Sequence, residues 1–342
     1  MKAIAKTRPA PGVEIIEVDE PRIQPGMVKV KLKAASVCGT DLHIYSWDAW
    51  SASRIQPPRI IGHEFCGEIV EVGSGVNRQV GEYISSESHV VCGRCRQCLN
   101  GQGHVCVNTR ILGVDIDGGF APYVVIPADN AVPANPAIPP RIAAFQDALG
   151  NAVHTATAGP VEGQTILITG LGPIGLFAAT VCRALGAKKI AGTEVSPYRL
   201  NIAAQMGMDA VFDMREKDAD KRIYEFMPEG FDGTLEMSGH PSAISLAIRN
   251  TRPGGRISLL GIFPENIQPV DINQAIFKGL DLQGIVGRNL WKTWKEMAKL
   301  HESGKLNLDP VITHEMHYTE FQTAMELMKA GQAGKVVFHF DD

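Results

Sequence analysis

The pattern of apolar and polar positions changes part of the way along the chain. From Met27 to Lys33 apolar and charged residues alternate (M-V-K-V-K-L-K), which predicts a strand with one buried face. Glu68–Val72 is a second short strand candidate, and frequent turn residues nearby predict a β-rich first part. Thr165–Thr169 (T-I-L-I-T) is instead a short apolar run, typical of a parallel strand buried on both faces.

Strand-like and helical segments alternate after this change. Ile174–Leu185 is predicted to be a helix that Gly186 ends. Such alternation predicts a doubly wound parallel sheet, the Rossmann architecture, in an α/β protein. The further predicted strands are Lys189–Glu194, Ala210–Phe212, Asp232–Glu236, Arg256–Leu260 and Leu282–Val286.

The last part of the chain departs from this alternation. Two helices are predicted over Asn289–His301 and Glu320–Ala330, followed by a strand over Lys335–Phe340. We therefore expect a β-rich catalytic domain over 1–147, a nucleotide-binding domain over 148–289, and a return of 290–342 to the first domain.

Composition narrows the class of protein. The chain has 342 residues, a formal net charge of -4, 44% apolar and 20% charged residues, which is ordinary globular composition and disfavours general nucleic-acid binding. We find neither a signal-peptide pattern nor a long apolar run, so we expect a cytoplasmic protein without a membrane partner. In that reducing compartment the seven cysteines point to metal binding or catalysis rather than disulfides.

Four of these cysteines lie close together, spaced C-x2-C-x2-C-x7-C from Cys92 through Cys95 and Cys98 to Cys106. Four thiolates are the ligand set of a closed tetrahedral structural zinc site, and nearby glycines suit a tight loop around an ion. The sequence predicts a zinc-binding lobe over 92–106. Four cysteines also hold iron–sulfur clusters, which is the alternative.

A glycine-rich motif, G-L-G-P-I-G, runs from Gly170 to Gly175 directly after a predicted strand and opens a helix. This context supports a dinucleotide site. Gly170 permits a tight turn, Gly172 lets a pyrophosphate approach the backbone, and Gly175 lets the helix pack close to the sheet. The helix N-terminus then supplies amide donors.

Glu194 ends the next predicted strand. Its carboxylate would accept hydrogen bonds from a ribose and repel a 2′-phosphate, so NAD is favoured over NADP. Arg199 weakens this preference slightly, because a guanidinium attracts phosphate.

Three further residues, Cys38, His63 and Glu64, are unremarkable singly, since a lone cysteine or histidine is usually structural. Together they offer a thiolate, an imidazole and a carboxylate. This set suits a catalytic zinc that keeps one position open for substrate. A non-enzymatic zinc protein of the same fold is the alternative, and the acidic charge and the completeness of this set disfavour it.

These motifs, in this order, resemble the zinc-containing medium-chain dehydrogenases over essentially the whole chain. The resemblance implies a GroES-like catalytic domain beside the Rossmann domain, hydride transfer to NAD, two zinc ions per subunit (one catalytic, one structural) and a homotetramer. It also implies that Cys38, His63 and Glu64 hold the catalytic zinc, and that Thr40 and His43 form a proton relay.

Asp147 falls where relatives carry an acid, and we favour a place beside the metal, serving the relay, over direct contact with zinc. Relatives often have acid-Pro-Phe-Gly here, whereas this chain has Asp147-Ala148-Leu149-Gly150, and the absence of the proline frees the backbone beside the acid. The positions that match nucleotide contacts are Ile174, Glu194, Arg199, Leu260, Gly261, Ile262, Ile285 and Val286.

Four stretches resemble one branch of the family, whose members oxidise the C3 hydroxyl of L-threonine to 2-amino-3-oxobutanoate. They are V-C-G-T-D-L-H-I-Y (37–45), W-D-A-W (47–50), G-N-A-V-H-T (150–155) and I-V-G-R (285–288). In that reading Asp48 would meet the substrate ammonium. The alternative is a polyol or secondary-alcohol dehydrogenase of the sorbitol or 2,3-butanediol type, with the same catalytic parts and a different pocket.

Overall fold

The computed structural model describes residues 1–263 and 269–340, and the chain divides into two compact units. One unit is Met1–Ala148 together with Ile312–Asp342, and the other is Leu149–Val311. The last predicted boundary is wrong, because residues 290–311 belong to the second unit. Their helix α11 (Lys292–Glu302) buries Trp294 and Met297, and Met297 lies beside Gly150 of the same unit.

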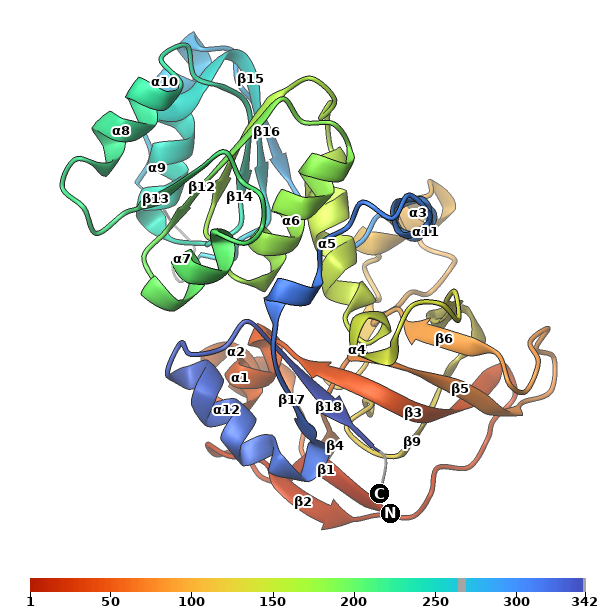
Figure 1. Cartoon of the computed structure of the whole chain (residues 1–342). Coiled ribbons are helices and arrows are strands. Elements are labelled where there is room, and N and C mark those ends of the chain that lie inside the picture. Colours follow the sequence, from red (N-terminus) through yellow and green to blue (C-terminus); the bar gives the residue numbers. More distant parts are fainter. Residues whose placement is uncertain (264–268, 341–342) are drawn as a thin grey trace. The chain divides into compact units, whose positions relative to one another are not determined.

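The first unit is built on a seven-stranded sheet in the order β10-β6-β5-β3-β18-β17, with β9 also paired to β3 (Figure 1). Its strands are β3 (Met27–Val37), β5 (Glu64–Val72), β6 (Tyr83–Ser86), β9 (Tyr123–Pro127), β10 (Ala131–Pro133), β17 (Ile312–His317) and β18 (Lys335–His339). The alternation predicted for β3 is confirmed over its first half, after which residues 34–37 are all buried. β5 begins earlier than predicted, because residues 64–67 are buried on both faces and show no alternation.

The register of this sheet places distant segments side by side. β3 pairs with β5 so that Ser36 lies opposite Glu64, and β18 pairs antiparallel with β3 so that Val336 lies opposite Val37. The C-terminal strand therefore lies beside the end of β3, where Cys38 follows. The core of this unit is apolar. In it the rings of Phe120 and Phe338 pack edge to face, with their centroids 5.4 Å apart.

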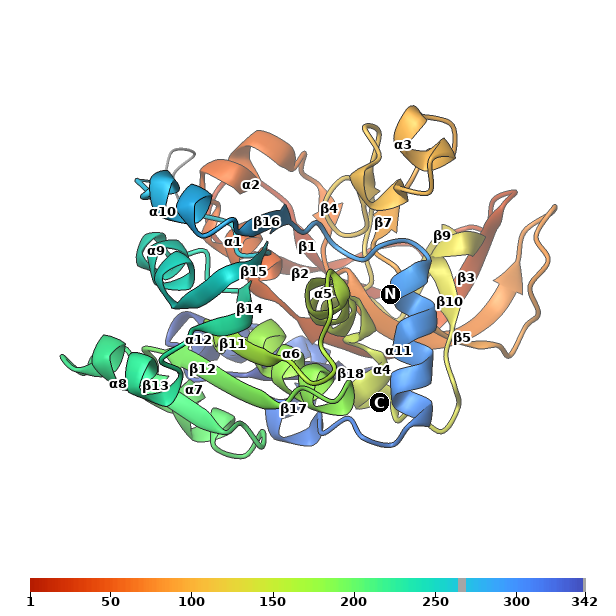
Figure 2. The ribbon, with the colours of Figure 1, turned by 90° about the horizontal axis from the view of Figure 1, so that it is seen from above.

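Short elements complete the first unit. Figure 2 shows helix α3 (Arg96–Leu99) on a projection beyond β7 (His89–Val90). The other elements are β1 (Lys2–Lys6), β2 (Glu14–Glu17), β4 (Arg59–Ile60), β8 (Arg110–Ile111), α1 (Gly39–Ser46), α2 (Ala49–Arg54), α4 (Pro140–Ala143), α12 (Phe321–Lys329) and the 3-10 turns Gly103–Val105, Ala128–Asn130 and Tyr318–Glu320.

The second unit contains a six-stranded sheet in the order β13-β12-β11-β14-β15-β16, and all of its pairs are parallel. This is the Rossmann order, so the predicted doubly wound sheet is confirmed. Its strands are β11 (Thr165–Thr169), β12 (Lys189–Glu194), β13 (Ala210–Asp213), β14 (Phe231–Glu236), β15 (Thr251–Leu259) and β16 (Asp281–Gly284).

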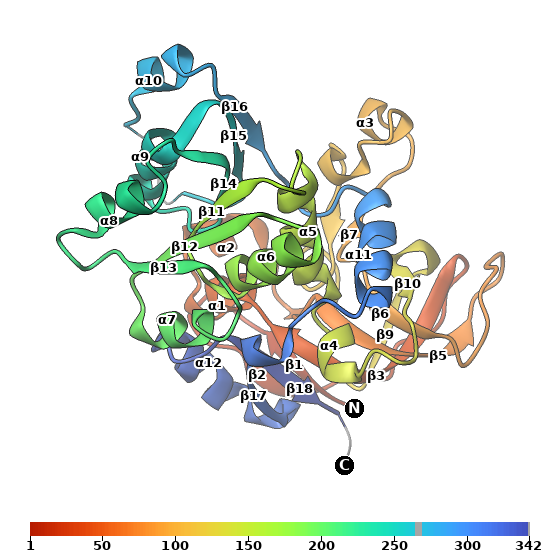
Figure 3. The ribbon, with the colours of Figure 1, turned by 45° about the horizontal axis from the view of Figure 1, so that its top comes forward.

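Helices cover both faces of this sheet. Figures 1 and 3 show α8, α9 and α10 on one side and α6 on the other. The helices are α5 (Gln146–Thr157), α6 (Pro173–Ala184), α7 (Pro197–Ala203), α8 (Ala219–Phe226), α9 (Pro241–Asn250), α10 (Ile272–Phe277), α11 and the turn Asp309–Val311. Among the residues that the structure describes, no helix is long and apolar enough to span a bilayer.

Candidate functional site

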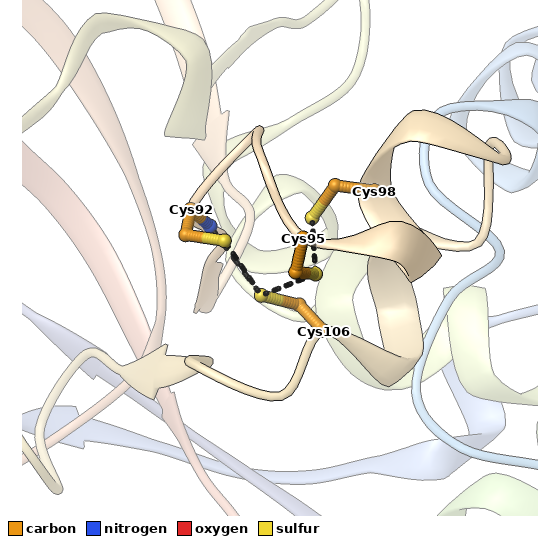
Figure 4. A group of neighbouring side chains, drawn as sticks. All are labelled: Cys92, Cys95, Cys98 and Cys106. Atoms are coloured by element: carbon orange, nitrogen blue, oxygen red, sulfur yellow. Dashed lines mark hydrogen bonds between the residues drawn. The ribbon is translucent and has the colours of Figure 1, made fainter.

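The predicted cysteine lobe brings its four sulfur atoms together (Figure 4). The Sγ atoms of Cys95 and Cys98 are 3.4 Å apart, those of Cys95 and Cys106 are 3.7 Å apart, and those of Cys92 and Cys106 are 3.5 Å apart. Thiolates at ~2.3 Å from a tetrahedral zinc would be about 3.8 Å from one another. The lobe therefore has the size that a zinc ion requires.

Hydrogen-bond donors surround these sulfur atoms. The backbone amide of Arg94 is the main cause that lowers the pKa of the Cys92 thiol to about 6, and Asn108 Nδ2 donates to the same sulfur at 3.5 Å. The backbone N–H of Asn108 donates to Cys106 Sγ at 3.4 Å. Such donors stabilise the thiolate, which is the form that binds metal.

A second cluster forms where β3 ends and β5 begins. Cys38 Sγ lies 3.3 Å from His63 Nε2, close to the roughly 3.6 Å expected for sulfur and nitrogen ligands of one tetrahedral zinc. Ligand atoms of His63, Glu64 and Asp147 all lie within 4.8 Å of one another, and all three side chains are buried. The structure thus brings Cys38 and Glu64 each close to His63, in two groups that share this histidine. The second group also contains Asp147, whose Oδ1 accepts a hydrogen bond from the Ser88 backbone at 3.1 Å.

Asp41 belongs to this neighbourhood although the sequence analysis did not select it. Its carboxylate lies within 4.8 Å of the Cys38 and His63 ligand atoms. Within the described residues, Asp41 Oδ1 and His63 Nδ1 are buried without a hydrogen-bond partner. Burial raises the pKa of the Asp41 carboxyl and also raises that of the Cys38 thiol. A buried set of this kind is poorly satisfied by the protein alone and fits a bound cation.

Lys335 is a buried neighbour of this cluster that the sequence analysis missed. Its Nζ donates to Glu64 Oε2 and, at 3.1 Å, to the Val37 carbonyl, while Ser36 Oγ also donates to Glu64 Oε2. The side chains of Lys335 and Glu64 are 2% and 3% exposed. The available signal was a lysine opening an otherwise apolar strand (K-V-V-F-H), because a buried lysine requires a charged partner.

The predicted relay residues lie on helix α1, which starts directly after Cys38. Thr40 and His43 are three residues apart and so project from one helix face. His43 Nδ1 lies 2.5 Å from Asp48 Oδ2, and Asp48 Oδ1 accepts a hydrogen bond from the Ser51 backbone at 2.9 Å. Both oxygens of Asp48, which the sequence analysis assigned to a substrate ammonium, therefore have protein partners.

The three glycines of the motif have the conformation, open space and close packing that the sequence analysis expected of them. Gly170 has φ +84°, a conformation that suits glycine. A Cβ on Gly172 would meet only Arg199 Nη1, at 3.9 Å, so this side of the loop is open. A Cβ on Gly175 would lie 2.0 Å from the Gly170 carbonyl, so close helix–strand packing excludes any larger residue there.

The other predicted nucleotide contacts follow the carboxyl ends of the parallel strands, which share one edge of the sheet. Glu194 is buried at the end of β12, and its Oε2 accepts a hydrogen bond from the Leu171 amide of the glycine loop at 2.9 Å. Arg199 Nη1 lies 3.9 Å from the same oxygen. Leu260, Gly261 and Ile262 follow β15, and Ile285 and Val286 follow β16, so these residues share that edge with the glycine loop.

The two cysteines outside the clusters, Cys66 and Cys182, are buried, and burial raises the pKa of each thiol to about 12. A thiol with so high a pKa is unreactive at neutral pH, so both are structural.

Comparison with known proteins agrees with this geometry. Residues 24–137 match the alcohol dehydrogenase GroES-like domain, and residues 173–303 match the zinc-binding dehydrogenase domain. The L-threonine 3-dehydrogenase of Thermococcus kodakarensis is 49% identical over 99% of this chain and 97% of its own length. That of Bacillus licheniformis is 45% identical over 98% of each chain.

Solved structures show the same fold. A short chain alcohol dehydrogenase from Escherichia coli CFT073 in complex with NADH superposes with a TM-score of 0.90 at 30% identity, over 99% of each chain. An alcohol dehydrogenase from Thermus sp. ATN1 superposes with a TM-score of 0.91 at 28% identity, over the full length of both chains. The chain therefore belongs to the zinc-binding alcohol dehydrogenases, the family that contains the L-threonine 3-dehydrogenases it resembles.

Proposed function

We propose that this protein oxidises the C3 hydroxyl of L-threonine to 2-amino-3-oxobutanoate and passes the hydride to NAD. The observation that carries this proposal is that His63 lies in two overlapping ligand groups, one with Cys38 and one with Glu64, in a chain that matches an L-threonine 3-dehydrogenase along almost its whole length. The cluster supplies the chemistry of an alcohol dehydrogenase, and the relatives indicate the substrate.

Cys38, His63 and Glu64 would hold a catalytic zinc, which when bound supplies a Lewis acid that makes a neighbouring hydroxyl more acidic. The two anionic ligands, the Cys38 thiolate and the Glu64 carboxylate, balance the charge of a divalent ion, so a third anionic ligand would weaken that acidity. Asp147 accordingly stays beside the metal, where its Oδ1 accepts the Ser88 amide.

The four cysteines would hold a second, structural zinc. Their sulfur separations of 3.4 to 3.7 Å support this. An iron–sulfur cluster is the alternative for four thiolates. A colourless protein with two equivalents of zinc per subunit supports the proposal, and a brown protein contradicts it.

Thr40 and His43 would carry the substrate proton away. Thr40 Oγ accepts the hydroxyl proton as it passes its own to the imidazole of His43, which is 60% exposed and releases it to water. Histidine suits this step, because its protonation state changes within the physiological pH range.

NAD would bind at the carboxyl edge of the Rossmann sheet, where it supplies the hydride acceptor. The open side of Gly172 admits the pyrophosphate, and Glu194 accepts hydrogen bonds from the adenosine ribose. Glu194 would also repel the 2′-phosphate of NADP. Arg199 lies beside Glu194, which offsets the attraction of the guanidinium for a phosphate.

We also infer that the protein is a homotetramer in the cytoplasm. Among the described residues, β16 has a neighbouring strand on one side only, which leaves backbone groups available for pairing with another subunit. Apolar side chains are exposed nearby, including Ile276 at 65% and Phe277 at 88%. Light scattering should give the mass of four chains; the mass of one chain would contradict this.

The test of the proposed reaction is NADH formation with a panel of L-threonine, L-serine, sorbitol, 2,3-butanediol and a simple secondary alcohol. We expect the highest kcat/KM with L-threonine. Preference for a diol or polyol would keep the zinc sites and the relay and would overturn the substrate assignment. Higher kcat/KM with NADP than with NAD would overturn the role of Glu194.

A further inference from the structure

We propose that Asp48 is a positioning residue that orients the relay base His43, and that the W-D-A-W segment exists to hold this pair. The inference rests on the proposed dehydrogenase function, in which His43 moves the proton. It replaces the sequence-based assignment of Asp48 to the substrate ammonium.

The first support is the backbone between the two residues. Helix α1 ends at Trp47, which has φ 54° and ψ 50°. Among the described residues, Trp47 is the only non-glycine with positive φ. A bulky residue in this region is strained, and such strain is retained where a precise arrangement is needed. Trp47 is the C-cap of α1 and Asp48 is the N-cap of α2, so this one left-handed residue joins the two helices where Asp48 contacts His43.

The second support is how the Asp48 carboxylate is used. Its Oδ1 caps helix α2 through the Ser51 amide, at 2.9 Å, which fixes the side chain. Its Oδ2 then faces His43 Nδ1 at 2.5 Å. An ionised carboxylate only accepts hydrogen bonds, so His43 Nδ1 must carry the hydrogen. The neutral imidazole is thereby held in the tautomer whose Nε2 accepts a proton.

The third support is the pair of tryptophans. The Trp50 ring meets the His43 ring edge-on, with centroids 6.2 Å apart and planes at 63°. The Trp47 ring lies under the Lys6 ammonium, 4.7 Å from its centroid, which anchors the turn to strand β1. The imidazole of His43 is therefore held in place by the W-D-A-W segment, through contacts of Trp50 and Asp48 and through the anchoring of Trp47.

This arrangement matters because His43 is 60% exposed. An exposed side chain samples several rotamers, and a proton relay works only in one of them. The Asp48 carboxylate restricts the ring and stabilises the imidazolium that forms when Nε2 takes the proton from Thr40. The imidazolium then releases a proton to water, which restores the neutral ring, and Asp48 stays ionised throughout.

The substitution Asp48→Ser tests the proposal, because serine still caps a helix but cannot reach His43 as a carboxylate. We expect kcat for threonine to fall about 10- to 100-fold with KM within about twofold. His43→Asn should lower kcat at least as much, and the double variant should be no slower than His43→Asn alone. Such non-additivity is what one residue acting through another requires.

Two outcomes would overturn the inference. A rise in the threonine KM at constant kcat would return Asp48 to the substrate ammonium. Effects that multiply in the double variant would show that Asp48 acts independently of His43.

A measurement without substrate separates this inference from the proposed function. In protein labelled with 15N-histidine, the His43 signals are those that His43→Asn removes. We expect the protonated nitrogen to be Nδ1 in the wild type and the Nδ1–H form to decline in Asp48→Ser. An unchanged tautomer would defeat the inference even if threonine is the substrate, whereas a shift with no threonine oxidation would defeat only the substrate assignment.

Discussion

The two candidate metal-binding regions of the first unit are assembled in opposite ways. The cysteine lobe takes every ligand from 15 consecutive residues, 92–106, and three of its four cysteines are partly exposed. The cluster of Cys38, His63 and Glu64 is mostly buried and depends on pairing between β3, β5 and β18, with Lys335 lying 271 residues after Glu64. Local sequence sets the geometry of the lobe, whereas sheet register sets that of the candidate catalytic cluster.

This difference has a chemical counterpart. The lobe offers four identical thiolates surrounded by amide donors, which suit a closed site that only stabilises structure. The buried cluster combines thiolate, imidazole and carboxylate with a counter-charge from Lys335. Mixed ligands suit a site that must also bind a substrate oxygen.

The largest expected effect is that of His63→Ala. Loss of the central ligand should remove the zinc of the buried cluster only, and should lower kcat by about 10³-fold or more, since a Lewis acid contributes several kcal/mol. Metal analysis and kcat check this. The comparison fails if the variant loses both ions, because the two regions would then not be independent.

The next effect is that of Lys335→Met. It leaves the Glu64 carboxylate buried without its counter-ion, so we expect the free energy of unfolding to fall by about 3 kcal/mol. Lys33→Met is the matched control in the same sheet, since Lys33 pairs with Glu68 at 42% and 45% exposure and should contribute less than about 1 kcal/mol. Urea unfolding of the metal-free proteins measures both. Equal losses would show that burial does not distinguish the two pairs.

A substitution in the predicted NAD site serves as a control for both candidate metal regions, because it should affect turnover without affecting metal binding. Glu194→Ala should lower kcat/KM for NAD about 10-fold, roughly 1.4 kcal/mol, and raise it for NADP, because the repulsion of a 2′-phosphate is removed beside Arg199. Zinc content should stay unchanged. Steady-state kinetics with both nucleotides are the readout, and an unchanged NAD:NADP ratio would contradict the role of Glu194.

The smallest effect on turnover is expected for Cys98→Ser. The lobe should lose its zinc and become sensitive to protease within 92–106, while kcat per catalytic zinc stays within about threefold, since distant sites act independently. Limited proteolysis and single-turnover rates give the two readouts. A collapse of kcat with the catalytic zinc retained would mean that the lobe shapes the active site.

The sequence predicted what is local or periodic. The four cysteines and the glycine motif were found because their meaning lies in short spacings, and β3 and β11 because their apolar patterns are regular. The beginning of β5 was missed because residues 64–67 are buried on both faces, where alternation disappears. The boundary near residue 290 was misplaced because pattern alone does not show which core a helix joins.

The partners of the candidate site were harder to predict. Cys38, His63 and Glu64 were selected by residue type and by resemblance, and their approach depends on strand register. The Lys335 contact joins strands from opposite ends of the chain, so no spacing reveals it. The His43–Asp48 contact is only five residues apart but depends on the left-handed conformation of Trp47, which sequence rules assign to glycine or asparagine.

The position of Lys335 near the end of the chain also determines the order in which the two candidate metal regions can form during translation. The cysteine lobe contains all its ligands once residue 106 has left the ribosome, so it can close on an ion while most of the chain is still unmade. Glu64 instead waits for β18, which is translated near the end. We therefore expect the cysteine lobe of a nascent chain to be complete long before the candidate catalytic cluster, in which Glu64 gains its buried counter-ion only when β18 enters the sheet.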